Sequence, residues 1–159
     1  MEHIRTRLFQ VEDLQRVVWI NRTTLPENYP GLFFMSIYES FPKTFIVAED
    51  EDKKEIVGYV MGRVERGFSN LKNFKLTKKG HIVSIAVIEE YRRKGIASQL
   101  LKEAEEGFRG YDASESFLEV RKSNLEAVNL YQKLQYTTQK ILPGYYRDGE
   151  DAILFASPL

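Results

Sequence analysis

The sequence predicts an α/β (α+β) protein in which a single mixed, mainly antiparallel sheet of about seven strands is flanked by about four helices. Three observations support this prediction. Short β-rich apolar stretches alternate with stretches whose apolar residues recur every three to four positions. Pro and Gly separate these stretches, and no repeat or low-complexity tract divides the chain. A length of 159 residues suits one core, so we expect one domain over residues 1–159.

The composition, with 43% hydrophobic and 29% charged residues, is typical of a soluble globular protein. No apolar run approaches the ~20 residues that span a bilayer, and the N-terminus lacks a signal-peptide pattern, so we expect a cytoplasmic protein. The 23 Lys and Arg residues balance 23 Asp and Glu residues, which predicts no membrane partner and no specific nucleic-acid partner. The absence of cysteine excludes disulfides, thiolate metal sites and a cysteinyl acyl intermediate.

The first half of the chain is predicted to form a strand, two helices and a β-hairpin. Residues 3–9 are the first strand. The residues that recur at helical spacing in the first helix are Leu14, Val17, Val18 and Asn21. The Pro-rich segment 25–31 must be a loop, and an apolar helix over residues 32–41 follows. An acidic turn joins strands 44–48 and 56–61, which predicts the hairpin.

The second half is predicted to alternate strands and helices after a basic loop over residues 67–79. Residues 81–88 are almost wholly apolar, as expected of a buried central strand. The apolar face of the next helix consists of Ile96, Leu100, Leu101, Ala104 and Phe108. A strand over residues 117–120, a helix over 124–134 and a final strand over 152–156 complete the order β-α-α-β-β-β-α-β-α-β-β. This order contains one further strand, without bounds, between the last helix and the final strand.

The most informative stretch is Arg92-Arg93-Lys94-Gly95-Ile96-Ala97, which joins a predicted strand to a predicted helix. Such a turn presents unpaired backbone N–H groups at the positive end of a helix dipole, where a pyrophosphate can bind. Gly95 and Ala97 keep side chains out of its approach, and three basic residues add positive charge. The stretch is neither a Walker loop nor a dinucleotide fingerprint. By itself it is equally consistent with an ordinary basic helix start.

With the strand Val83-Ser84-Ile85-Ala86-Val87 before it, this stretch resembles the signature [RQ]-x-x-G-x-[GA] of the GNAT superfamily of N-acetyltransferases. The resemblance implies the GNAT fold, splayed at the cofactor-binding strand, with acetyl-CoA or CoA as cosubstrate and no metal. It implies that backbone groups of Ile85, Ala86 and Val87 bind the pantetheine arm. The cofactor-binding residues that it implies in the turn are Arg92, Arg93, Lys94, Gly95, Ile96, Ala97 and Ser98.

A second block, Val120-Arg121-Lys122-Ser123-Asn124 followed by Tyr131, is similar to the same family. There Asn124 is implied to contact the cofactor and Tyr131 to lie near the thioester sulfur. Nearly the whole chain resembles the NatA class of N-terminal acetyltransferases and its archaeal counterparts. The strings that carry this resemblance are 25–29, 80–84, 118–124 and 144–152. Eukaryotic members usually carry His where this chain has Glu119, a departure that fits the archaeal branch.

The acceptor in such a reaction must be a neutral amine. A free α-amino group has a pKa of about 7.7–8.0, against about 10.4 for Lys, so a modest base is enough for a protein N-terminus. Glu27 is the predicted chief base or amine anchor, and His81 is predicted to assist. Tyr131 either donates to the departing thiolate or simply packs within its helix. Because the chain lacks cysteine, direct attack in a ternary complex is the expected route.

Two loops are predicted to line a peptide groove that admits a chain end and rejects an internal Lys. The predicted substrate-binding residues are Leu25, Glu27, Tyr29, Tyr145 and Tyr146. The tyrosines are equally compatible with covering the edges of the core. The resemblance implies Ser, Ala and retained Met as first residues of nascent or mature substrate proteins.

Alternative functions remain open at this point. One is a GNAT enzyme acting on Lys, a polyamine or one ribosomal protein, and another is a CoA-binding interaction module without turnover. Glu27, His81 and Tyr131 together favour catalysis, because a module without turnover needs none of them. The basic loop 67–79 is either a solvated loop or a contact with the ribosome or its RNA. We expect a monomer or a weak dimer.

Overall fold

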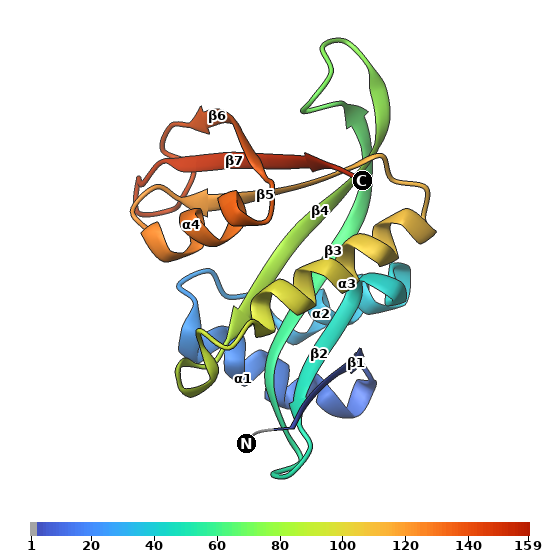
Figure 1. Cartoon of the computed structure of the whole chain (residues 1–159), viewed down its shortest axis with the longest axis vertical. Coiled ribbons are helices and arrows are strands. Elements are labelled where there is room, and N and C mark those ends of the chain that lie inside the picture. The colour runs from blue at the N-terminus through green and yellow to red at the C-terminus, as the bar shows by residue number, and fades with distance from the viewer. Residues whose placement is uncertain (1–2) are drawn as a thin grey trace. The chain divides into compact units, whose positions relative to one another are not determined.

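The computed structural model describes residues 3–159, which form seven strands and four α-helices (Figure 1). The strands are β1 (Ile4–Leu8), β2 (Phe45–Asp50), β3 (Glu55–Phe68), β4 (Leu76–Val87), β5 (Glu115–Arg121), β6 (Thr137–Leu142) and β7 (Ala152–Pro158). The helices are α1 (Leu14–Thr24), α2 (Gly31–Ser40), α3 (Ile96–Gly110) and α4 (Leu125–Lys133). The predicted order of elements is confirmed.

The strands form one sheet in the order β1-β2-β3-β4-β5-β7-β6. Pairing is antiparallel for β1–β2, β2–β3, β5–β7 and β6–β7, and parallel for β4–β5, where His81 is paired with Phe117. The sheet is therefore mixed and mainly antiparallel, as predicted. Among residues 3–159, no helix is long and apolar enough to cross a membrane.

Backbone contacts group the described residues into two compact units. The first contains the residues up to Arg63 together with Ile82–Gly110, and the second contains Val64–His81 together with Tyr111–Leu159. The boundary after Arg63 falls inside β3, and the boundary after His81 falls inside β4. Each of these strands therefore contributes residues to both units. The prediction of one domain over residues 1–159 stays a prediction.

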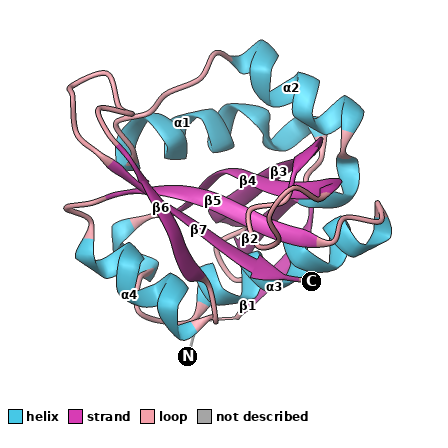
Figure 2. Ribbon diagram, turned by 90° about the horizontal axis from the view of Figure 1, so that it is seen from above, coloured by secondary structure: helices cyan, strands magenta, loops and turns pink. Residues whose placement is uncertain are grey.

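In the first unit, α1 and α2 cover one face of the strands and α3 covers the other (Figure 2). The apolar stripe predicted for α3 is confirmed, because Ile96, Leu100, Leu101, Ala104 and Phe108 are all buried. On the face covered by α1 and α2, Phe34 of α2 and Phe45 of β2 are fully buried in the core, with ring centroids 6.5 Å apart.

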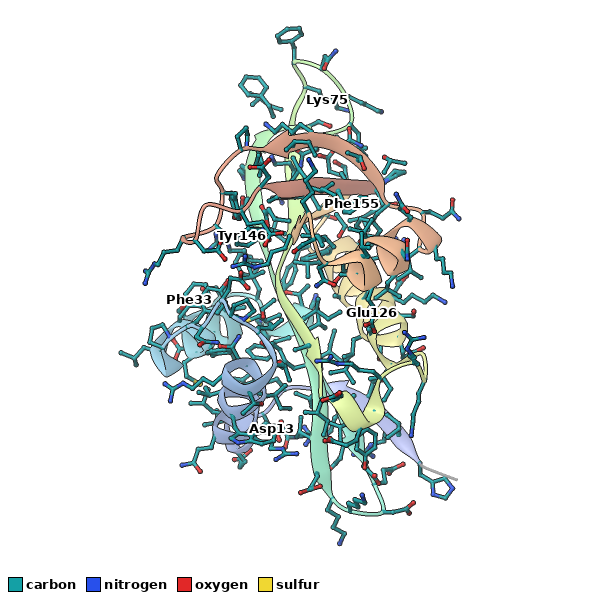
Figure 3. The ribbon with its side chains drawn as sticks, turned by 90° about the vertical axis from the view of Figure 1, so that its left-hand side faces the viewer. Asp13, Phe33, Lys75, Glu126, Tyr146 and Phe155 are labelled. Atoms are coloured by element: carbon teal, nitrogen blue, oxygen red, sulfur yellow. The ribbon has the colours of Figure 1, made fainter. Side chains whose placement is uncertain are left out.

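In the second unit, α4 packs through Tyr131 against Tyr136 and Phe155, the last of which is marked in Figure 3. The strand predicted without bounds is β6, whose residues are mostly exposed and polar. It lacked an apolar pattern because it sits at the edge of the sheet, paired with β7 only.

One predicted boundary and two predicted burial patterns differ from the structure. Strands β3 and β4 extend into the predicted basic loop, which shortens to residues 69–75 because Ser69 N donates to Lys75 O and closes a hairpin. Burial along β4 alternates, so this strand is half-buried rather than wholly buried. In α4 the predicted apolar side is wrong at Leu125, which is 68% exposed in the first turn.

Candidate active site

The turn between β4 and α3 has the backbone that an anion site requires. Gly95 has φ +81° and Arg93 has φ +62°, and successive conformations of this kind direct neighbouring N–H groups toward one side. The first helical hydrogen bond of α3 runs from Gln99 N to Gly95 O. The N–H groups of the preceding helical residues therefore have no carbonyl one turn back and face outward at the positive end of α3.

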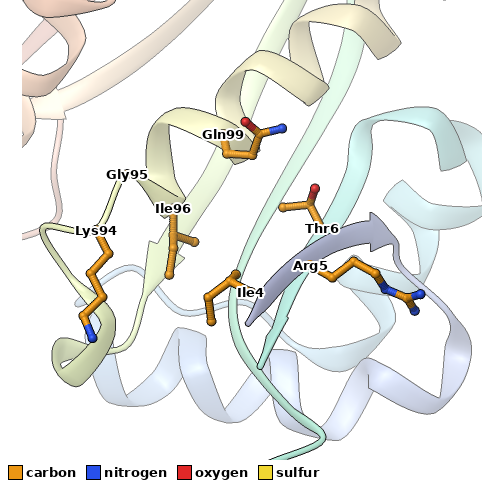
Figure 4. A pocket seen from close by; sticks show the side chains of 7 residues that line it. All are labelled: Ile4, Arg5, Thr6, Lys94, Gly95, Ile96 and Gln99. Atoms are coloured by element: carbon orange, nitrogen blue, oxygen red, sulfur yellow. The ribbon is translucent and has the colours of Figure 1, made fainter. Parts of the chain in front are cut away.

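The space beside this turn fits a phosphate group. A Cβ built on Gly95 would meet no atom within 4 Å, so glycine is required here by its φ and not by crowding within the chain. The turn opens onto a cavity of about 730 Å³. Figure 4 shows the residues that line it, which are Ile4, Arg5 and Thr6 of β1 with Lys94, Gly95, Ile96 and Gln99.

The basic residues of the turn differ in how they are held. Arg92 donates from Nε to Val87 O at 3.0 Å, which ties the turn to the end of β4. Lys94 places its Nζ 5.3 Å from the centre of the Tyr91 ring. Both side chains, like that of Arg93, are exposed, so their charges reach the solvent in front of the turn.

The end of β4 approaches β3 unusually closely at Gly58. A Cβ on Gly58 would lie 3.0 Å from Ala86 O and 3.1 Å from Val87 Cγ2. Ile88 N, just after β4, donates to the carbonyl oxygen of Val57, which precedes Gly58 on β3. This packing fixes the backbone of Ile85–Val87, to which the resemblance assigns the pantetheine arm.

The loop between α1 and α2, which carries three predicted substrate residues, is held by a buried asparagine. Asn21 is fully buried, and its Nδ2 donates to Glu27 O at 3.0 Å and to Tyr59 Oη at 3.1 Å. Its Oδ1 accepts from Tyr29 N at 3.3 Å. The Asn21 side chain thus holds the backbone of the loop at Glu27 and at Tyr29.

This network continues to β4. Tyr59 Oη lies 2.7 Å from Ser84 Oγ, and both side chains are buried. Burial raises the pKa of Tyr59 to about 12, against the opposing effect of these hydrogen bonds, so the phenol stays neutral. Asn21, Tyr59 and Ser84 were not predicted to have a role in the site. The available signal was a polar residue, Asn21, at helical spacing among apolar ones.

Leu25, Glu27 and Tyr29 occur at alternating positions of this loop and are all half-buried. The Tyr29 ring stacks on Phe33 at 4.8 Å and meets Phe34 edge-on at 6.1 Å. The first unit therefore places the cofactor turn and the loop of Glu27 on a common framework of β3, β4 and α1. The packing role that the sequence left open for Tyr29 is present, and does not conflict with a contact to substrate.

In the second unit, His81 lies between two carboxylates. Its Nδ1 is 2.7 Å from Glu65 Oε2, and its Nε2 is 2.8 Å from Glu119 Oε1. The imidazole stacks on Phe117 with a centroid distance of 4.4 Å and an interplanar angle of 9°. Three neighbouring strands thus contribute one member each to a cluster that we call the histidine clamp, Glu65–His81–Glu119.

The clamp favours a protonated histidine. Burial by itself lowers the pKa of His81, but hydrogen bonds and charge from Glu119 and Glu65 outweigh it, so the pKa is raised above its ordinary value. Only the imidazolium form has an N–H on both ring nitrogens to donate to both carboxylates. From the sequence, Glu119 is only a departure from related enzymes, and Glu65 is not predicted to belong to the site. Neither could be placed beside His81, because only the pairing of the strands brings these residues together.

Tyr131 of α4 is buried, and its burial raises the pKa of the phenol well above the ordinary value. It therefore remains protonated and can donate a hydrogen bond. Asn124 is the N-cap of α4, and its Oδ1 accepts from Ala127 N at 3.2 Å. The conformation of Asn124 is thereby fixed at the exposed start of the helix, where the resemblance assigns it a cofactor contact.

The loop between β6 and β7 is organised by Arg121 of β5. Arg121 Nη1 donates to Asp148 and to Glu150, at 2.8 Å each, and its guanidinium lies 4.2 Å from the centre of the Tyr146 ring. Tyr145 and Tyr146 meet edge-on at 5.0 Å. Hydrogen bonds from Ser123 and from Arg121 lower the pKa of Glu150 to about 2, so this ionic network persists at neutral pH.

The predicted site residues are thus divided between the units. The first unit holds Leu25, Glu27, Tyr29, Ile85, Ala86, Val87 and the turn residues Arg92, Arg93, Lys94, Gly95, Ile96, Ala97 and Ser98. The second holds His81, Asn124, Tyr131, Tyr145 and Tyr146. Within the described part of the chain, no group of three or more His, Cys, Asp or Glu side chains is arranged to hold a metal ion.

Comparison with known proteins gives a consistent result. Residues 12–136 match the acetyltransferase (GNAT) family. The chain is 49% identical over 152 residues to the N-alpha-acetyltransferase of Saccharolobus solfataricus, covering 94% of this chain and 90% of that protein. It is 36% identical over 144 residues to the N-terminal acetyltransferase A complex catalytic subunit of Arabidopsis thaliana, covering 89% and 71% respectively.

A solved structure agrees with the fold. Naa20 of Chaetomium thermophilum, crystallised with a bisubstrate analogue, superposes with a TM-score of 0.84 at 30% identity, covering 98% of this chain and 86% of that one.

Proposed function

The chain belongs to the acetyltransferase (GNAT) family, and we propose that it transfers the acetyl group of acetyl-CoA to the α-amino group of protein N-termini. The observation that carries the proposal is the turn before α3, where a left-handed Gly95 leaves open space in front of outward-facing N–H groups. The 49% identical relative is named for this activity. The proposed substrates of this chain start with Ser, Ala or retained Met.

The cosubstrate is held by the first unit. Backbone N–H groups from Arg93 to Ser98 take the pyrophosphate, with Arg92 and Lys94 supplying charge. The backbone of Ile85–Val87 takes the pantetheine arm, fixed in place by the close packing against Gly58. Acetyl-CoA supplies the thioester carbonyl that the amine attacks.

Glu27 anchors the incoming amine and accepts its proton, directly or through water. Its backbone is fixed by Asn21, so the carboxylate is carried on a loop that is ordered before the peptide arrives. Tyr29, in the same loop, and Tyr145 and Tyr146 bind the peptide. An internal Lys side chain is disfavoured as acceptor, because its higher pKa leaves a much smaller fraction of neutral amine near pH 7.

His81 assists as part of the clamp. A protonated His81 cannot itself accept a proton, so it assists through the Glu65 and Glu119 carboxylates, which it holds at 2.7 Å and 2.8 Å. Tyr131 remains protonated and donates a hydrogen bond to the departing thiolate. Full proton transfer from Tyr131 is unfavourable, because its raised pKa exceeds that of a thiol.

The test measures thiol release from acetyl-CoA with peptides that start with Ser, Ala or Met-Leu, and with N-terminally blocked peptides that contain one internal Lys. We expect turnover with the free N-termini and at least tenfold less with the blocked peptides. Equal rates for the two sets would instead support an enzyme acting on Lys, and spermidine as acceptor tests the polyamine alternative.

Matched variants test the assigned residues. Glu27→Gln should lower kcat/KM by about 10²-fold, whereas Glu12→Gln, at an exposed position of the same unit, should not. His81→Ala should reduce kcat, with His3→Ala as the control at the other histidine of the chain. Full kcat in both Glu27→Gln and His81→Ala would refute the assignment of the bases, and absence of turnover in the unmodified protein would support the binding-module alternative.

A further inference from the structure

The hairpin formed by the end of β3, residues 69–75 and the start of β4 concentrates positive charge. Residues 66–79 contain five basic residues, Arg66, Lys72, Lys75, Lys78 and Lys79, and no Asp or Glu. The whole chain has 23 residues of each sign, so the remainder has 18 basic and 23 acidic ones. A zero net charge therefore conceals a cationic hairpin on an otherwise acidic protein.

The same hairpin exposes large apolar side chains. Phe74 is 93% exposed, Leu76 is 70% exposed and Phe68 is 61% exposed. Phe68 and Leu76 flank the hydrogen bond from Ser69 N to Lys75 O that closes the hairpin. Figure 3 shows Lys75 at the end of this hairpin. Exposed aromatic rings that alternate with cations are the combination that binds single-stranded nucleic acid.

The hairpin is held in shape by the body of its own unit. Glu115 is buried and accepts from Ser69 Oγ and from Asn70 N, at 2.5 Å each. Ser69 Oγ in turn accepts from Leu71 N and Lys72 N. The buried carboxylate of Glu115 is thus engaged in anchoring the loop.

A cavity of about 290 Å³ lies at the base of the hairpin. It is lined by Arg66, Gly67, Leu76, Thr77 and Lys78. Two cations border it, Gly67 contributes backbone without a side chain, and Leu76 supplies an apolar wall. These features suit a nucleotide, whose phosphate needs cations and whose base needs an apolar surface.

We propose that this hairpin, residues 66–79, is a binding site for single-stranded RNA without sequence preference. Lys72, Lys75 and Lys78 contact backbone phosphates, and Phe68 and Phe74 stack on bases. The site belongs to the second unit alone and involves none of the residues assigned to acetyl transfer. It does not depend on the proposed enzyme activity.

The order of side chains favours RNA over an anionic membrane. Along the loop, Lys72, Phe74, Lys75, Leu76 and Lys78 alternate, so insertion of the apolar groups into lipid would drag ammonium groups out of water. A nucleic acid, by contrast, offers alternating phosphates and bases to such a surface. The cavity beside Gly67 also has no use in a membrane-inserting loop.

The test is fluorescence anisotropy of a labelled 12-nucleotide oligouridine RNA over 50–300 mM KCl. We expect saturable binding with a Kd on the order of 10⁻⁵ M at the low-salt end. The triple variant Lys72→Gln/Lys75→Gln/Lys78→Gln should weaken binding at least about tenfold and reduce the slope of log K against log[salt] by about 2. The control Lys102→Gln/Lys133→Gln/Lys140→Gln removes the same charge from exposed positions elsewhere and should change neither.

The double variant Phe68→Ser/Phe74→Ser should weaken binding at least about fivefold without changing the salt slope, because stacking is not ionic. A far-UV circular dichroism spectrum and a thermal unfolding midpoint unchanged from the parent show that each variant is folded. Failure of the parent protein to bind RNA at 50 mM KCl would overturn the proposal. Equal weakening by the two lysine triples, or binding to vesicles with 30% phosphatidylserine in preference to RNA, would overturn it as well.

Discussion

Gly95 determines both the backbone conformation of the turn before α3 and the open space in front of it. Its φ of +81° lies in the region that a side chain disfavours, and the space around it is open. A side chain at this position therefore affects the turn in two ways. It strains the backbone, and it occupies the space in which we place the pyrophosphate.

Gly95→Ala should raise the KM for acetyl-CoA and weaken CoA binding measured by calorimetry, each by at least about tenfold. The backbone strain should also lower the free energy of unfolding by about 1 kcal/mol. Gly149→Ala provides the control, because Gly149 has φ +91° and equally open surroundings but lies in the loop between β6 and β7. Equal loss of CoA affinity in both variants would show that strain alone is responsible.

His81 offers a direct readout of the clamp, because the chain has only two histidines. In an NMR titration, His81 should lose its proton at a higher pH than the ordinary value near 6.5. Glu65→Gln and Glu119→Gln should each lower the pKa of His81. A His81 that titrates below 6.5 in the parent protein would contradict the clamp.

The clamp also makes stability depend on pH. Because the pKa of His81 is raised in the folded state, its stabilising contribution is complete below the unfolded pKa near 6.5. It is lost as the pH rises through the folded value. The difference in unfolding free energy between the parent and His81→Gln, from urea denaturation, should therefore shrink between pH 6 and pH 9.

At the scale of elements, the segment between α1 and α2 shows how a loop without regular structure becomes ordered, at the place where we propose that the peptide binds. Pro26 and Pro30 exclude helix and sheet. Asn21 then supplies, from the buried side of α1, the hydrogen bonds that fix the loop. Strand β3 contributes Tyr59 to the same network.

Asn21→Ala should raise the KM for the peptide several-fold and leave the KM for acetyl-CoA unchanged, because it frees the backbone of the Glu27 loop whereas Tyr59 keeps its hydrogen bond to Ser84 of β4. It should also lower the free energy of unfolding by about 1–3 kcal/mol, since buried partners lose their donor. Asn129→Ala, at an exposed position of α4, is the matched control. Peptide KM and acetyl-CoA KM rising together would mean that the whole unit has been disturbed.

At the scale of the whole molecule, the balance of charge governs contacts between copies. The sequence pI is about 6.8, so repulsion between copies is weakest at neutral pH. Solubility at low salt should pass through a minimum near pH 6.8 and increase toward pH 5 and pH 8.5, as measured by static light scattering. The minimum should become shallower with salt, because attraction between the cationic hairpin and acidic surfaces is screened. A scattering signal independent of pH and salt would contradict this expectation.

The sequence by itself determined the order of the elements, because the apolar stripe of α3 and the apolar strands β2 and β3 are periodic and local. It also determined the turn that we propose binds the cofactor, since Gly95, the adjacent basic residues and the helix start are contiguous. The tertiary structure alone decided which polar side chains meet. Glu65, His81 and Glu119 come from three strands, and Asn21 reaches Tyr59 across 38 positions of sequence. No local pattern encodes such contacts, because strand pairing and helix packing bring together residues whose separation along the chain carries no periodic signal.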